Sequence, residues 1–67
     1  MRTLFELSPQ GVRAANANAP HIYDLVPHKE NGEVVGIVLR HDNMVMVDTF
    51  AQWLSDEGIA YSMGGTQ

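Results

Sequence analysis

The sequence contains no cysteine. Disulfide bonds, cysteine-based zinc sites and thiol catalysis are therefore excluded. In a chain of 67 residues, burial of apolar surface offsets chain entropy only narrowly, and many domains of this size depend on cross-links, metals or oligomerisation. Packing, a histidine-based metal or a second protein chain must supply the stability here.

Basic residues are also scarce: the chain has four Lys and Arg against eight Asp and Glu, a formal net charge of −4. Nucleic-acid binding is driven by clustered Lys and Arg that release counterions from the phosphate backbone. The basic residues stand singly along the chain, at Arg2, Arg13, Lys29 and Arg40. This scatter argues against direct nucleic-acid binding, and the acidic residues are too spread in sequence to predict a face that mimics nucleic acid. The charge balance favours a basic or neutral partner.

No apolar run approaches the length of a membrane span, and residues 1–7 are too short and too acidic for a signal peptide. We therefore expect a cytoplasmic location and no membrane partner. The chain is predicted to be a single small domain over residues 1–67. Within it, residues 1–20 form a weak strand and helix lead-in, residues 21–63 the core, and residues 64–67 a flexible polar tail.

Most of the large apolar side chains lie in residues 33–63. The β-branched run over residues 34–39 is typical of a buried strand. The following Asp42 and Asn43 predict a two-residue hairpin turn, because both residue types tolerate left-handed backbone. A second strand is then expected over residues 44–47.

A helix is predicted after this strand. Thr49 and Gln52 fit a capping box at its start. Its apolar stripe has the spacing i, i+3 and i+4 and consists of Phe50, Trp53 and Leu54. Gly58 suits the C-terminal end of the helix, and the alternation over residues 59–63 predicts a closing strand.

The N-terminal half carries weaker signals. Residues 3–7 alternate as a short strand, and Ser8 followed by proline is a typical helix start. Residues 22–26 read as another strand. Asn31 followed by glycine is the strongest hairpin turn in the chain. Pro27 cannot donate to a strand ladder, so its strand is expected at a sheet edge or to be bulged there.

Together these elements predict an α+β fold: a small three-stranded antiparallel meander with a packed C-terminal helix and a short closing strand, in the order α-βββ-α-β. On a two-residue hairpin loop, Val26 would lie opposite Ile37. The closing strand would run parallel to the strand at residues 44–47. One face of the sheet would be incompletely covered, because the N-terminal helix is weak.

A small metal- or ligand-binding domain is one alternative function. In the predicted register His21 and His41 fall near one end of the sheet, close to Asp24 and Asp42. Imidazole and carboxylate ligands, with His21, His41 and Asp42 as the set, could hold a divalent metal. The competing interpretation is that these are surface residues flanking turns. We expect no cofactor.

Enzymatic activity is not predicted. Ser8, Ser55 and Ser62 carry no nucleophile motif, and a domain of this size has little interior in which to form a catalytic pocket.

The favoured function is a non-enzymatic protein-interaction module. Methionine is common on surfaces that adapt to a partner, although plain core filling is the alternative reading. The predicted partner-binding residues are Met44, Met46, Tyr23, Asp56 and Glu57. A homodimer is also expected, through the incompletely covered sheet face or through strand pairing at the edges over residues 22–26 and 59–63.

The order helix, three strands, helix is similar to that of double-stranded-RNA-binding domains, but the second helix, DTFAQWLSDEG, has no Lys or Arg. In length and charge the chain resembles the small phage-encoded inhibitors of host defence or host enzymes, anti-CRISPR proteins among them. It is similar in the same way to small antitoxin domains with a βββαβ core. The first resemblance implies an inhibitor that blocks a surface of a larger complex, and the second implies an antitoxin-like domain.

Overall fold

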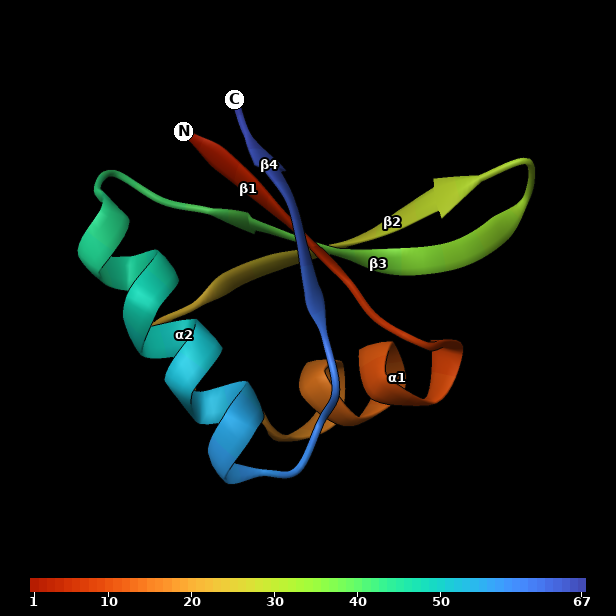
Figure 1. Ribbon diagram of the computed structural model, residues 1–67, viewed down its shortest axis with the longest axis horizontal. Coiled ribbons are helices and arrows are strands. Elements are labelled where there is room, and N and C mark those ends of the chain that lie inside the picture. The colour runs from red at the N-terminus through yellow and green to blue at the C-terminus, as the bar shows by residue number, and fades with distance from the viewer.

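The computed structural model describes residues 1–67, which form four strands and two helices (Figure 1). In chain order the elements are β1 (Arg2–Glu6), α1 (Pro9–Asn18), β2 (Asp24–Glu30), β3 (Glu33–Arg40), α2 (Met44–Asp56) and β4 (Ser62–Thr66). The predicted α+β class is confirmed.

The four strands make one antiparallel sheet in the order β2-β3-β1-β4. The N-terminal strand β1 is therefore central, although its sequence signal is short. Strands β2, β3 and β1 are antiparallel neighbours in that order. β1 therefore occupies the position beside β3 that was predicted for residues 44–47.

Both helices lie on the same side of the sheet (Figure 1). Successive side chains of a strand point to opposite faces, so Phe5 and its cross-strand neighbour Ile37 are fully buried beneath the helices. The complete core also takes residues from both helices and consists of Phe5, Leu7, Val12, Ala15, Ile37, Leu39, Val47, Phe50 and Leu54. The opposite face of the sheet carries no helix, and Leu4 and Val38 there are only half-buried.

Residues 44–47 form the first turn of α2, so the predicted strand and the hairpin turn before it are wrong. Asn43 caps the helix: its side-chain oxygen accepts hydrogen bonds from the backbone N–H of Val45 at 3.0 Å and of Met46 at 3.3 Å. Asn is among the best N-cap residues. Thr49, predicted as the cap, lies inside the helix and donates its hydroxyl to the Met46 carbonyl at 3.1 Å.

The buried stripe of α2 begins earlier than predicted, at Val47, and continues through Phe50 and Leu54. These positions are three and four residues apart and therefore share one face. Phe50 is fully buried and packs edge-on against Phe5, with ring centroids 5.0 Å apart. Trp53, placed in the predicted stripe, is half-buried and stacks beside Phe50.

The closing strand also differs from the expectation. It covers Ser62–Thr66 and pairs antiparallel with β1 rather than parallel with residues 44–47. Residues 64–66 therefore belong to the sheet and are not a tail outside it. Gly64 is needed at this point, because a Cβ atom there would lie 2.6 Å from Cδ2 of Leu4.

The hairpin between β2 and β3 confirms the predicted Asn31 turn: Asn31 and Gly32 have φ of 52° and 81°, as a two-residue turn between antiparallel strands requires. Its register differs by one residue beyond a bulge in β3, so Val26 lies opposite Val38 and not Ile37. The position of β2 at a sheet edge agrees with the restriction imposed by Pro27.

Candidate functional site

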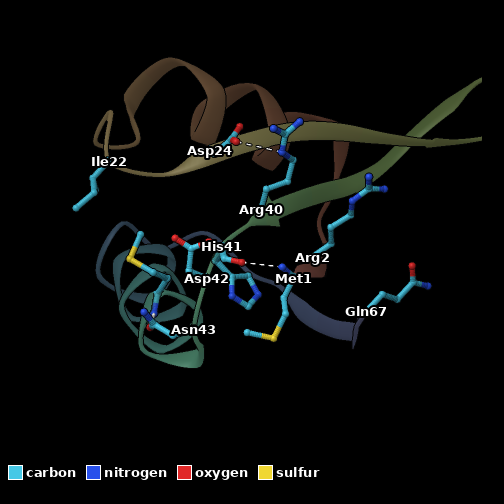
Figure 2. A pocket seen from close by; sticks show the side chains of 10 residues that line it. Met1, Arg2, Ile22, Asp24, Arg40, His41, Asp42, Asn43 and Gln67 are labelled. Atoms are coloured by element: carbon cyan, nitrogen blue, oxygen red, sulfur yellow. Dashed lines mark hydrogen bonds and ion pairs between the residues drawn. The ribbon is translucent and has the colours of Figure 1, made fainter.

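An open hollow of about 900 Å³ lies at the end of the sheet where β3 leads into α2 (Figure 2). We call it the end hollow. It is lined by Met1, Arg2, Ile22, Asp24, Arg40, His41, Asp42, Asn43, Met46 and Gln67. Its polar residues come from the starts of β1 and β2, from the end of β3 and the segment leading into α2, and from the residue after β4. Met1, Ile22 and Met46 supply apolar side chains.

Cross-strand pairing places the charged residues of the end hollow. Arg40 is directly opposite Arg2 on one side and Asp24 on the other. Its Nε donates to the Asp24 carboxylate at 3.1 Å (Figure 2). Both side chains of this ion pair are more than half exposed, so it contributes little stability. The amino group of Met1 donates to the carbonyl oxygen of His41 at 2.8 Å, which holds the chain start against the end of β3.

His41 is the one histidine that the fold buries. Its Nε2 lies 2.7 Å from the hydroxyl oxygen of Thr3, and that oxygen lies 2.9 Å from the hydroxyl of Thr66. These three side chains form a hydrogen-bonded chain across the end of β3, the central strand β1 and the edge strand β4. The other ring nitrogen, Nδ1, is buried without a partner in the chain.

An imidazole beside a hydroxyl is also the arrangement of a general base and its nucleophile. Thr3, however, is fully buried and already bonded to Thr66, so its hydroxyl is held away from any substrate in solution. Of the serines considered above, Ser8 caps α1 by accepting from the Gly11 N–H, and Ser62 donates to Glu6. Each of these hydroxyl groups therefore has a hydrogen-bond partner within the folded chain.

The fold does not assemble the predicted metal ligands. His41 and Asp42 line the end hollow, but His21 is exposed and lines a different depression beside α1. Nowhere in residues 1–67 do three or more His, Asp or Glu side chains form a group that could hold a metal ion. The ligand set of His21, His41 and Asp42 is therefore wrong. Its basis was a sheet register that placed His41 in a hairpin, whereas the chain after His41 enters a helix.

Four of the five predicted partner-binding residues lie on α2 or at its end. Met44 is 48% exposed, Met46 is half-buried, and Asp56 and Glu57 are exposed. Tyr23 instead packs against the core, with its ring centroid 5.1 Å from that of Phe50.

Val45 and Ile22 are exposed apolar residues that the predicted partner-binding set did not include. Val45 is 66% exposed at the start of α2, and Ile22 is 72% exposed before β2. Val45 was counted within an apolar strand. Once Asn43 is recognised as a cap, helical spacing turns Val45 away from the buried stripe that begins at Val47.

The net charge is concentrated on α2 and its flanks. Residues 1–40 hold all four basic residues and four acidic residues, so they are neutral overall. Residues 41–67 hold no basic residue and carry the whole charge of −4, as Asp42, Asp48, Asp56 and Glu57. All four are exposed. Four of the eight acidic residues thus lie on or beside α2, in the part of the chain that has no basic residue.

Neither helix has the length and apolar character needed to cross a membrane. Comparison of the chain with protein-family models, with curated proteins and with solved structures finds no match.

Proposed function

We propose that this chain is a non-enzymatic protein-interaction module that docks on a basic surface of a larger protein. The docking site is the exposed side of α2, which we call the α2 surface. It consists of Met44, Val45, Asp48, Asp56 and Glu57. The concentration of the entire net charge on α2 and its flanks is the observation that supports this proposal most directly.

Spacing along α2 supports a continuous surface. Val45, Asp48 and Asp56 share a helical stripe with Gln52, because they follow one another at three or four residues. The Gln52 amide donates to the Asp56 carboxylate at 2.8 Å, which orients this acidic group along the stripe. No Lys or Arg lies on the helix to neutralise it.

Two of the acidic residues on the α2 surface are not placed where they would stabilise the helix. Asp56 and Glu57 lie at the C-terminal end of α2, where the helix dipole is negative and an anionic side chain is unfavourable by about 0.3–1 kcal/mol. A positive partner surface would offset this cost. Stability alone therefore gives no reason for their position, whereas docking does.

Met44 and Val45 would supply the apolar contacts. At 48% and 66% exposed, they present apolar area next to the acidic stripe, and methionine can adjust its shape to a partner. A basic surface of the kind that holds phosphate groups would be complementary in charge. By occupying such a surface, the chain would act as an inhibitor.

Matched neutralising variants test the proposal. Asp48→Asn combined with Asp56→Asn removes two charges from the α2 surface, and Glu30→Gln combined with Glu33→Gln removes two charges from the exposed β2–β3 turn. Each pair is used, beside the parent, to capture proteins from a lysate of the organism that encodes the chain. We expect one partner to be retained by the parent and by the turn variant and to be lost with the α2 variant.

Cross-linking followed by mass spectrometry then maps the contact, which should join α2 to a Lys- and Arg-rich surface of the captured protein. Two outcomes would reject the proposal: a partner held equally by the α2 variant, or a contact mapped to an uncharged or acidic surface. Val45→Ser should weaken the same complex, while Val26→Ser, on the uncovered sheet face, should not.

A further inference from the structure

The two edges of the sheet differ in how they are protected. Exposed edges offer unpaired backbone groups to other chains, and natural proteins block them with charged residues, proline, bulges or short strands. The edge strand β2 carries Pro27 together with charged residues at both ends, Asp24 and Glu30. The edge strand β4 has the sequence SMGGT and carries neither a charge nor a proline; its bulge is at Gly64, and the positions after it, Gly65 and Thr66, are in regular register with β1. All five of its residues are exposed.

The hydrogen bonds of the chain end show which groups of β4 are open. Gln67 exchanges both backbone hydrogen bonds with Arg2, at 2.7 Å each. In an antiparallel ladder, such hydrogen-bonded pairs alternate with pairs whose N–H and C=O groups point away from each other. The neighbouring pair, Thr3 and Thr66, is of the second kind. The N–H and C=O groups of Thr66 are therefore directed outward from the sheet.

We propose that β4 pairs antiparallel with β4 of a second copy of this chain. A two-fold axis beside the edge runs the two identical strands in opposite directions, and the two four-stranded sheets then form one continuous antiparallel sheet. The second copy fits because β4 places no charge beside its symmetry mate. The net charge lies on α2 and its flanks, and Gly64 and Gly65 leave the strand without bulky side chains at its centre.

Met63 gives this contact an apolar component. It is 48% exposed and lies opposite Phe5 in the ladder, at the border between the buried core and solvent. Pairing across the edge would cover part of this exposed area. A 67-residue domain without cross-links gains from any such burial.

Sedimentation equilibrium of the parent and of two variants at position 66 tests the pairing. Thr66→Pro removes both the outward N–H and the side-chain hydroxyl of Thr66. Thr66→Val removes the hydroxyl alone and keeps the N–H, so it is the matched control. We expect the parent and Thr66→Val to sediment at twice the monomer mass of 7.4 kDa and Thr66→Pro to sediment as a monomer. Circular dichroism checks that each variant is folded.

Met63→Lys provides a second route that leaves the backbone unchanged, since it places like charges near each other across the axis; a monomer is expected. A parent that stays monomeric up to millimolar concentration would overturn the inference. So would a dimer that survives Thr66→Pro and Met63→Lys, or one lost only in Val38→Lys, because that result would place the contact on the uncovered sheet face.

Discussion

At the residue scale, the hydrogen-bonded chain of Thr3, His41 and Thr66 explains how polar groups can lie at the end of a small core. A buried polar group is costly unless it is bonded, and the Thr3 hydroxyl meets both neighbours, at 2.7 Å and 2.9 Å. Thr3 thereby joins the end of β3 to the edge strand β4 across the central strand.

Replacing this hydroxyl should be destabilising. Thr3→Val preserves side-chain shape but leaves the buried His41 ring without its only hydrogen bond, so we expect a loss of about 1–3 kcal/mol in the free energy of unfolding, measured by urea denaturation. Thr66→Val is the control: Thr66 is exposed, so water can replace the bond and the loss should be smaller. Equal losses of unfolding free energy in the two variants would contradict this account of the hydrogen bonds among Thr3, His41 and Thr66.

At the element scale, α2 depends on a cap that lies six residues before the predicted one. Asn43 binds two backbone N–H groups at the helix start, whereas Thr49 bonds back to Met46 within the helix. The position of the cap decides that Met44 and Val45 are helical and exposed. It therefore also determines the α2 surface.

Two alanine variants separate the two capping positions. Asn43→Ala should lower the free energy of unfolding by about 1 kcal/mol, because two N–H groups lose their partner. Thr49→Ala should be neutral or slightly stabilising, because alanine has the higher helix propensity in an exposed helix interior. Thermal or urea denaturation of both variants measures this, and a larger loss for Thr49→Ala would show that the helix starts later.

At the scale of the whole molecule, charge and edge chemistry lie on different elements. The net charge of −4 belongs to α2 and its flanks, and the uncharged edge belongs to β4. The two proposed contacts therefore have different physical origins, one electrostatic and one through backbone hydrogen bonds.

Salt should distinguish them. Raising the ionic strength shortens the distance over which exposed charges interact, so the complex with a basic partner should weaken steadily. The β4–β4 dimer should keep its dissociation constant, because no charged residue of the strand takes part. Affinity and sedimentation measurements over the same salt series check both expectations; a partner complex indifferent to salt would count against docking through α2.

Much of the architecture could be predicted from local signals. The Asn31 turn, the Ser8 cap and the exclusion of β2 from the sheet interior by Pro27 each follow from backbone chemistry that does not depend on distant residues. The candidate site was less accessible. Met44, Met46, Asp56 and Glu57 were predicted as partner-binding residues, but within a strand and a later helix, and Val45 and Asp48 of the proposed α2 surface were not in that prediction.

Two decisions depended on tertiary structure. A run such as Met44 to Val47 suits a strand or a helix equally, and burial of Val47 with Phe50 and Leu54 favours the helix. The short strand β1 and the glycine-containing β4 have weak local preference, and they become strands by pairing with each other and with β3.

Local chemistry thus determined the Asn31 turn and the Ser8 cap, because each depends on residues close in sequence, and composition alone determined the absence of disulfide bonds and the sign of the charge. The order of the strands, the centrality of β1 and the helical state of residues 44–47, which exposes Met44 and Val45 on α2, were decided only by the fold. These features depend on which apolar faces can be buried together, and that is a property of the whole chain.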